Sequence, residues 1–208
     1  MIRIVAIKIQ SEHTRRSFEA ELSAQWLAAW RERHPKLCGL SPSPKTERIA
    51  TESLAGLCLA VRAGARGELF YDEKGRPCLK DRHMDLSITH TDGYALCALG
   101  EGRIGLDAER IDRANALMAE RLMQRWFCDS ERQAYAQAPS ELRFLELWTR
   151  KEAAVKASGI GLAALAETDT LLMGKEGNTA FSTWQTEGLV VTLCHSQNER
   201  VLDEIEWI

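Results

Sequence analysis

Residues 104–111 read IGLDAERI and combine the pattern of a buried β-strand with two carboxylates. Because successive side chains of a strand point to opposite faces, Asp107 and Glu109 share one face with Gly105, while the aliphatic residues between them face the other way. A rise of about 3.3 Å per residue places the two acids about 6.6 Å apart. Two like charges this close disfavour each other's ionisation unless a positive group lies between them. The run therefore predicts either an edge strand with one solvated face or a site for a divalent cation.

The composition is that of an ordinary globular chain. Its 208 residues are 45% hydrophobic and 27% charged, and the formal net charge is −3. This length permits one domain or two small halves that share a core. The slightly acidic balance argues against a broad nucleic-acid-binding surface, so we expect no nucleic-acid partner.

Cysteine usage and the first residues bear on the compartment. The six cysteines include no C-x-x-C pair, which is typical of reduced core thiols rather than of a disulfide framework or a zinc site. Residues 1–10, MIRIVAIKIQ, read as a first strand without the pattern of a cleaved leader, and no segment is long and apolar enough to span a membrane. We therefore expect a cytoplasmic protein without membrane association.

Hydrophobic periodicity predicts helices followed by strands, twice along the chain. In the first part we expect a strand at 2–9, helices at 17–33 and 46–62, a loop at 41–44, and strands within 69–79 and at 85–90 and 94–100, with residues 104–111 as their neighbour. In the second part we expect helices at 114–127, 130–137 and 141–158, and strands at 168–173, 180–186, 188–195 and 204–208. This order predicts an α+β fold in which residues 1–208 form one unit of two similar halves, about 1–100 and 101–208.

The predicted helix at 141–158 carries a third carboxylate of interest. Glu152 lies on the same stripe as Trp148 and Val155, and Lys156 follows one turn later. A glutamate in an apolar stripe is paired, metal-bound or catalytic, because burial of an isolated charge is costly. The alternative is an exposed Glu152–Lys156 pair, which contributes only roughly 0.2–0.5 kcal/mol.

Together the three carboxylates could supply hard oxygen ligands to Mg²⁺. This ion takes few protein ligands and completes its coordination with water and substrate phosphate, so such a site predicts phosphate chemistry. Cationic side chains available to meet phosphates are Arg76, His90 and Lys156.

An ordered set of motifs carries a family resemblance. The motifs are GRPCL at 75–79, LSITHT at 86–91, IGLDAERI at 104–111, WFCDSER at 126–132 and WTRKEAAVKASGIGL at 148–162. In this order the chain resembles the 4′-phosphopantetheinyl transferases of the surfactin-synthetase-activating type, over roughly residues 70–162. The specific feature is G-x-D-x-E followed by W-x-x-K-E-x-x-x-K, after G-R-P and T-H.

The resemblance implies an enzyme that is a monomer and depends on Mg²⁺, with Mn²⁺ as an alternative. It implies transfer of the phosphopantetheine arm of coenzyme A (CoA) to a serine of an apo acyl or peptidyl carrier protein, with release of adenosine 3′,5′-bisphosphate. Such carriers serve fatty-acid, polyketide and nonribosomal peptide synthesis, and the sequence does not select among them. The implied fold has two pseudo-symmetric α+β halves with the active site in the cleft between them.

The resemblance also implies roles for individual residues. Asp107, Glu109 and Glu152 would hold the cation, and Glu152 would in addition be the general base for the serine hydroxyl. Lys156 would contact the pyrophosphate and stabilise the developing charge. The CoA contacts implied in the first half are Thr89 and His90 at phosphates and Arg76 near the nucleotide.

Two positions stand apart from the family pattern. Leu57 occupies the place of an arginine that contacts the CoA 3′-phosphate in the family, and Lys45 and Arg48 are the candidates to replace that arginine. Glu131 matches a recurrent family glutamate, but an acid in the first turn of a helix is also ordinary capping electrostatics. Its role stays open at this stage.

Two other functions compete with the transferase. A carboxylate–Mg²⁺ phosphohydrolase acting on CoA or nucleotides would use the same acids, with a positioned water in place of a carrier serine. A carrier-binding module without activity would not need the three acids and Lys156 together. Incubation with CoA alone separates the two enzymes, because a transferase leaves CoA intact.

Overall fold

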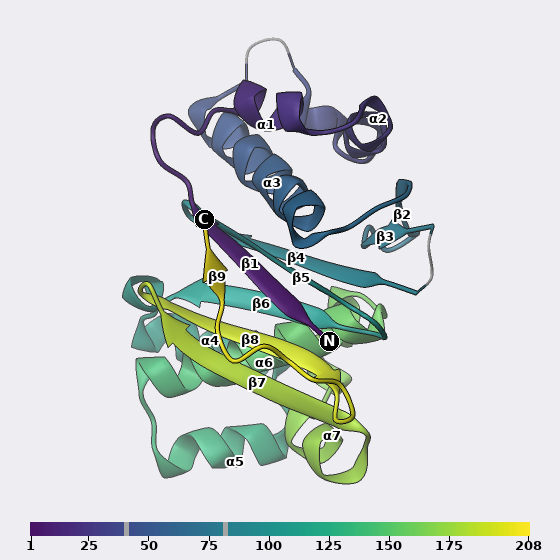
Figure 1. Ribbon diagram of the computed structural model, residues 1–208. Coiled ribbons are helices and arrows are strands. Elements are labelled where there is room, and N and C mark those ends of the chain that lie inside the picture. Colours follow the sequence, from purple (N-terminus) through teal and green to yellow (C-terminus); the bar gives the residue numbers. More distant parts are fainter. Residues whose placement is uncertain (40–41, 81–82) are drawn as a thin grey trace. The chain divides into compact units, whose positions relative to one another are not determined.

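A computed structural model describes residues 1–39, 42–80 and 83–208 (Figure 1). The chain divides into two compact units, which we call unit 1 (Met1–Gly102 with Arg200–Ile208) and unit 2 (Arg103–Glu199). The chain therefore returns to unit 1 at its C-terminal segment. The sequence pattern had placed this segment in the second half.

Unit 1 pairs a four-stranded sheet with one long helix and a separate hairpin. Its strands are β1 (Arg3–Lys8), β2 (Leu69–Tyr71), β3 (Pro77–Leu79), β4 (Asp85–Thr91), β5 (Tyr94–Gly100) and β9 (Glu206–Trp207). Its helices are α1 (Arg15–Glu21), α2 (Ala24–Arg33) and α3 (Pro44–Ala63), with a 3₁₀ helix at Pro35–Leu37. The sheet order is β4-β5-β1-β9, antiparallel except for the β1–β9 pair, and α3 packs on it (Figure 1).

Unit 2 has a three-stranded antiparallel sheet of order β6-β8-β7. Its strands are β6 (Gly105–Arg110), β7 (Thr179–Thr186) and β8 (Leu189–Ser196). Its helices are α4 (Ala116–Trp126), α5 (Asp129–Gln137), α6 (Glu141–Ser158) and α7 (Thr170–Glu176), with 3₁₀ helices at Ile111–Arg113 and Leu162–Glu167. The long helix α6 packs on β6 and β8.

The two units repeat one topology. In each unit a first strand is followed by helices and then by a hairpin, and the second strand of that hairpin lies at the centre of the three antiparallel strands. Thus β5 separates β1 from β4, as β8 separates β6 from β7. The predicted α+β class is confirmed, and the matching strand order gives the two halves their similarity.

The expectation that residues 104–111 pair with the strands at 85–100 is wrong. The open side of β5 is taken by β1, and β6 pairs instead with β8. The central strand β5 is buried along its whole length, so it needs a hydrogen-bonded partner on each side. The N-terminal strand supplies the second partner.

One helix prediction and one strand prediction also need correction, because helix caps override the hydrophobic pattern. The helix expected at 17–33 breaks at Leu22, which is extended, and restarts where the Trp26 N–H donates to Ser23 Oγ at 3.3 Å. The strand expected at 168–173 is instead the start of α7, where two backbone N–H groups donate to Asp169 Oδ1 at 3.0 and 3.1 Å. In the loop expected at 41–44, Ser41 lies outside the described residues and Ser43 caps α3.

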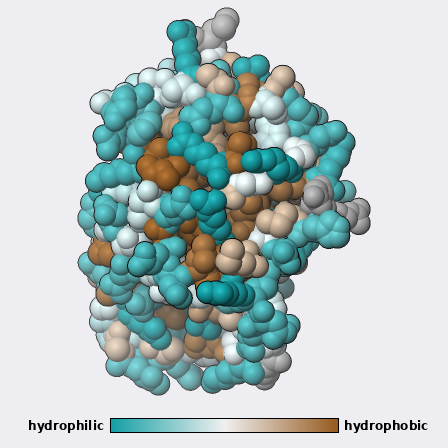
Figure 2. Space-filling view, viewed as in Figure 1, coloured by the Kyte–Doolittle hydropathy of each residue, from teal (hydrophilic) through white to brown (hydrophobic). Residues whose placement is uncertain are grey.

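The surface of the described residues mixes polar and apolar side chains. Figure 2 shows a mostly hydrophilic face with hydrophobic residues between the polar ones. Large exposed apolar side chains include Leu117, Ile160 and Phe70, a scatter that is normal for a folded chain. Within the described ranges, the helices are too short or too polar to cross a bilayer.

Gly105 sets the distance between α6 and β6. A Cβ atom at Gly105 would lie 2.0 Å from the Ala153 carbonyl oxygen and 2.5 Å from the Ala157 nitrogen. Only glycine permits this contact between a strand and a helix backbone. Ala153 and Ala157 immediately follow Glu152 and Lys156 in the chain, so the glycine fixes the position of the backbone that carries those two side chains.

A fully buried ion pair joins the helices of unit 2. Lys151 Nζ donates to Glu131 Oε2 at 2.6 Å and also to the Thr168 carbonyl. The other oxygen, Glu131 Oε1, accepts from the Thr170 N–H at 3.1 Å and the Thr170 hydroxyl at 2.7 Å. The Cys128 N–H donates to Glu131 Oε2 at 3.1 Å. Every lone-pair direction of Glu131 is thus engaged in holding α5, α6 and α7 together, which assigns this glutamate a structural role.

We expect Gly105→Ala to lower the free energy of unfolding by about 1–3 kcal/mol, because the added methyl group forces α6 away from β6. Urea unfolding measures the loss. Gly39→Ala is the matched control, since no described atom beyond the neighbouring residues lies within 4 Å of its added Cβ. Equal stability of the two variants would show that α6 and β6 tolerate a wider spacing.

Candidate active site

Asp107 lies at the contact between β6 and α6. Its side chain is buried, with 3% of the residue exposed, and Lys156 Nζ donates to Asp107 Oδ1 at 2.6 Å. The same ammonium donates to the Leu106 carbonyl at 3.1 Å. Strand β6 is the edge strand of its sheet, yet its carboxylate face is not solvated at Asp107. The predicted edge strand is thus confirmed without a solvated face at Asp107, and the cation site stays a prediction.

Glu152 belongs to the same group of charges. Burial, together with the nearby Asp107 and Glu109 carboxylates, raises the pKa of its carboxyl to about 7, and Lys156 opposes this rise. We call Asp107, Glu109, Glu152 and Lys156 the carboxylate cluster. Two like charges and one lysine thus act on the Glu152 carboxyl.

Lys156 stays charged in this environment. Burial lowers the pKa of its ammonium, but Asp107 and Glu152 outweigh that effect, and the net shift is upward. Its side chain keeps 27% of its surface exposed. A cation of fixed charge at a partly open position is suited to meet an anionic ligand.

The fit of the carboxylate cluster to a metal ion rests on its chemistry. Carboxylate oxygens are the ligands that Mg²⁺ prefers, and an excess of negative charge is what a divalent cation would neutralise. Across the described part of the chain, no three His, Cys, Asp or Glu side chains are grouped as ligands of one metal ion. At Asp107 the positive partner is Lys156. The metal role of Asp107, Glu109 and Glu152 therefore stays a prediction, supported by the donor set.

Behind the carboxylate cluster, three threonine hydroxyls link α6 to the sheet. Thr149 Oγ1 lies 2.8 Å from Thr192 Oγ1, which lies 3.1 Å from Thr183 Oγ1. Thr192 is the register partner of Asp107 on β8. Sequence reasoning missed Thr149, although a threonine within the W-T-R-K-E run is a polar residue in a buried helix face. These bonds hold α6 in register with Asp107.

The residues predicted to contact CoA lie in unit 1. On β4, Thr89 is buried, whereas 38% of the His90 side chain is exposed. The guanidinium of Arg76 is largely buried, and its Nη2 donates to Asp85 Oδ2 at 2.5 Å and to the Leu86 carbonyl at 3.2 Å. The β2–β3 hairpin is thereby fastened to the start of β4.

The two candidate substitutes for the family arginine lie near the start of α3. Lys45 is exposed in its first turn, and Arg48 forms an ion pair with Asp92. Arg48 Nε also lies 3.9 Å from Glu52 Oε1, on the same helix. Leu57, by contrast, is 1% exposed in the core of unit 1. An arginine at Leu57 would be buried here, whereas Lys45 and Arg48 lie on the surface of α3.

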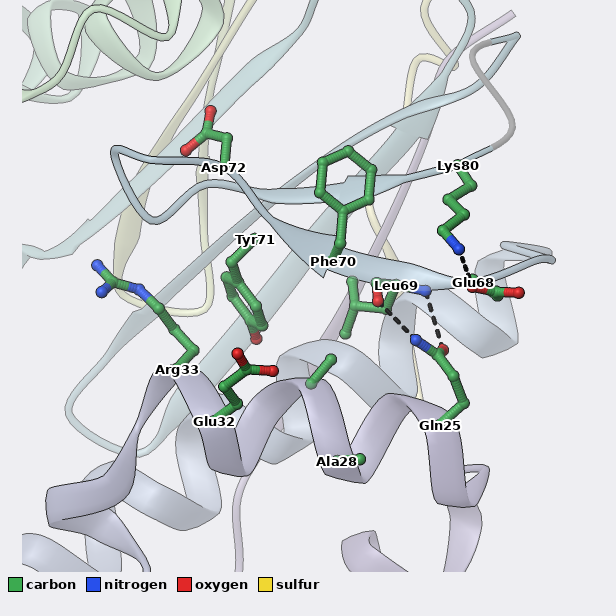
Figure 3. Close-up of a pocket in the computed structure, with 11 residues that line it drawn as sticks. Gln25, Ala28, Glu32, Arg33, Glu68, Leu69, Phe70, Tyr71, Asp72 and Lys80 are labelled. Atoms are coloured by element: carbon green, nitrogen blue, oxygen red, sulfur yellow. Dashed lines mark hydrogen bonds and ion pairs between the residues drawn. The ribbon is translucent and has the colours of Figure 1, made fainter.

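A cavity of about 580 Å³ lies elsewhere in unit 1, between α2 and β2 (Figure 3). At one end, the Gln25 side-chain amide donates to the Leu69 carbonyl and accepts from the Leu69 N–H, and Lys80 pairs with Glu68. None of the predicted site residues is among the described residues that line this cavity. The cavity is therefore separate from the predicted chemistry.

Comparison with known proteins agrees with the motifs. Residues 103–199 match the family model described as "ACPS: 4′-phosphopantetheinyl transferase superfamily". The chain is similar to 4′-phosphopantetheinyl transferase HetI of Nostoc sp., with 33% identity over 132 residues, which are 60% of this chain and 54% of HetI. It is also similar to 4′-phosphopantetheinyl transferase gsp of Aneurinibacillus migulanus, with 34% identity over 94 residues, 44% of this chain and 38% of gsp.

The chain thus spans about half the length of one of these relatives and less of the other. The matched segment contains the whole carboxylate cluster and the buried Glu131–Lys151 pair. Through residues 103–199, the chain is therefore similar to the 4′-phosphopantetheinyl transferase superfamily.

Proposed function

We propose that the protein transfers the 4′-phosphopantetheine arm of CoA to a serine of an apo acyl or peptidyl carrier protein. The observation that carries the proposal is the carboxylate cluster. It places Glu152, with a pKa raised to about 7, beside the Asp107–Lys156 pair within the two motifs of the superfamily. In the proposed reaction the serine Oγ forms a bond to the phosphorus of the arm, and the bridging P–O bond breaks. Adenosine 3′,5′-bisphosphate leaves with the bonding electrons.

We propose Mg²⁺, or Mn²⁺ in its place, as the metal, with Asp107, Glu109 and Glu152 as its ligands. When bound, the cation supplies Lewis-acid polarisation of phosphate oxygens. The three carboxylates supply the hard oxygen atoms, and the raised pKa of Glu152 supports the idea that they need more positive charge than Lys156 provides.

Glu152 is our candidate general base. A serine hydroxyl is a poor nucleophile until its proton is accepted, and a base with a pKa near the working pH does this best. The serine proton would move to a carboxylate oxygen of Glu152. Burial keeps this carboxyl less acidic than an exposed glutamate, which suits the role.

Lys156 is our candidate for stabilising charge on the phosphate oxygens. Because the surrounding carboxylates keep it protonated, it can donate to an oxygen that gains charge during transfer. In unit 1, we propose that Arg76, Thr89, His90, Lys45 and Arg48 contact the nucleotide and phosphates of CoA. Reduced cysteines support the cytoplasm as the compartment, and we propose that the enzyme acts as a monomer without nucleic acid or membrane.

The second candidate function is hydrolysis of CoA or nucleotides by the same acids. The carboxylate cluster alone is compatible with it, whereas the similarity of residues 103–199 to the superfamily favours transfer. The third candidate function is that of a carrier-binding module without activity, which would not need the raised pKa of Glu152. The deciding experiment is mass spectrometry of CoA and of an apo carrier protein after incubation with the protein and Mg²⁺.

We expect the carrier to gain the mass of one phosphopantetheine arm, and CoA to stay intact when the carrier is omitted. Asp107→Asn should lower the rate of transfer by about 10²-fold or more, because it removes charge from the proposed cation site. Asp112→Asn is the matched control, since Asp112 is an exposed acid paired with Arg110 just beyond β6. Loss of CoA without a carrier would instead support the hydrolase, and an unmodified carrier with intact CoA would support the binding module.

The pKa of Glu152 gives a second prediction, made for the protein without divalent cations. In the folded chain this carboxyl holds its proton up to about pH 7, whereas an unfolded chain releases it near pH 4.5. The folded state therefore binds more protons in this window, and the group's contribution to stability is lost as the pH rises from about 4.5 to 7. Glu152→Gln should raise the free energy of unfolding by about 1–3 kcal/mol at pH 8 and by much less at pH 5.

Urea unfolding at both pH values, with a chelator present, measures this difference. Glu141→Gln, in the exposed first turn of the same helix, controls for the loss of one negative charge. A gain in stability that is equal at pH 5 and pH 8 would mean that the Glu152 carboxyl is not held protonated by its neighbours.

A further inference from the structure

A buried carboxylate in unit 1 has no place in the roles described so far. Glu52 lies on α3 with 3% of its surface exposed. Its Oε1 accepts from the Gly93 N–H at 2.8 Å, in the turn between β4 and β5. Its Oε2 lies 3.6 Å from His90 Nδ1, an ion-pair distance rather than a hydrogen bond.

The charge on Glu52 is maintained in spite of burial. Burial alone would raise the pKa of its carboxyl, but His90, the Gly93 N–H and Arg48 lower it, and the net shift is downward. A buried carboxylate is costly unless its partners compensate for lost hydration. The compensation here comes chiefly from His90 and the Gly93 N–H.

A purely structural role does not account for this negative charge. Fastening α3 to the β4–β5 turn needs only one acceptor for the Gly93 N–H, and a glutamine amide oxygen would accept that bond equally well. The second oxygen faces the His90 ring. The carboxylate is therefore explained by what it does to His90.

The charged groups around His90 limit its behaviour. Glu52 and Arg48 face it from α3, Asp92 lies two residues beyond it, and His34 interacts with it electrostatically. Glu52 lies within ion-pair distance of a ring nitrogen, whereas Asp92 is paired with Arg48. A carboxylate beside Nδ1 orients the ring with Nδ1–H toward it, which leaves Nε2 for another partner.

We propose that Glu52 is a positioning residue that holds the His90 ring with Nδ1–H toward the buried carboxylate and presents Nε2–H to a phosphate of the substrate. Both nitrogens of a histidine are donors in the imidazolium form, so one can donate to the carboxylate and the other to a phosphate. A charged N–H donor binds phosphate more strongly than a neutral one. This inference rests on the proposed function, which gives His90 its phosphate contact.

The first test needs no substrate. Ring nitrogen NMR signals of ¹⁵N-histidine-labelled protein report which nitrogen of His90 carries a proton. We expect Nδ1 to be protonated in the wild-type chain and Glu52→Gln to shift the ring toward the Nε2–H neutral form. Glu47→Gln makes the same change of charge on α3 outside this group and should leave the signals unchanged. Identical His90 signals in the wild type and Glu52→Gln would overturn the proposal.

The second test measures CoA binding by calorimetry in a double-mutant cycle. We expect Glu52→Gln and His90→Gln each to weaken CoA affinity about tenfold, and the double variant to be no weaker than His90→Gln alone. In transfer assays the loss should appear in KM rather than in kcat. Additive losses would show that Glu52 acts without His90 and would overturn its positioning role.

The two tests separate failure of this inference from failure of the proposed function. A wild-type chain that binds no CoA would contradict the transferase proposal and the phosphate contact of His90. The ring signals would still decide whether Glu52 orients His90. Normal CoA binding with unchanged ring signals in Glu52→Gln would leave the transferase standing and reject Glu52 alone.

Discussion

The backbone contact between Gly105 and α6 is the constraint on which unit 2 depends. The helix approaches β6 so closely that any side chain at residue 105 would meet the carbonyl of Ala153 and the nitrogen of Ala157. Small residues on both surfaces make this spacing possible. Because the strand and the helix lie this close, Asp107 and Lys156 meet at 2.6 Å, and the Thr149–Thr192 hydroxyl contact can form behind them. The first residue of the G-x-D-x-E motif is therefore needed for packing, and the two acids are positioned by that packing.

Two lysines on α6 show how position along one helix divides structure from chemistry. Lys151 is fully buried, and Glu131 and the Thr168 carbonyl accept its hydrogen bonds. Removal of one member of such a pair typically costs about 3–5 kcal/mol, because the other charge is left buried and uncompensated. Lys156 faces three carboxylates instead and keeps part of its surface exposed. Lys151 thus holds α6 to α5 through a buried ion pair, whereas Lys156 lies within the carboxylate cluster, where we propose that a ligand binds.

Much of the fold follows from the periodicity of the sequence, and its failures have local physical causes. The long helices α3 and α6 and the hairpin β7–β8 were predicted because their apolar residues recur with one clear period. The break at Leu22 and the start of α7 were missed because Ser23 and Asp169 satisfy backbone N–H groups that the hydrophobic pattern ignores. The partner of β6 could not be read from the chain order, since β1 competes for the same edge of β5 and wins.

The candidate site was likewise predicted in part from the sequence. The motif spacing led to Asp107, Glu109, Glu152 and Lys156, and the other three of these groups all act on the pKa of Glu152. Sequence reasoning did not find Glu52, because a lone glutamate on a helix gives no sign that it is buried beside a histidine from another element. Nor did it show that Lys151, which precedes Glu152, is buried in an ion pair with Glu131.

The central claim is that the carboxylate cluster binds a divalent cation together with the pyrophosphate of CoA. Anomalous X-ray diffraction from crystals of the protein with Mn²⁺ and CoA tests it most directly. The account predicts a manganese peak bonded to carboxylate oxygens of Asp107, Glu109 and Glu152 and to a pyrophosphate oxygen, with Lys156 Nζ moved from Asp107 to phosphate. Bound CoA with the Lys156–Asp107 bond intact and manganese absent from these carboxylates would contradict it.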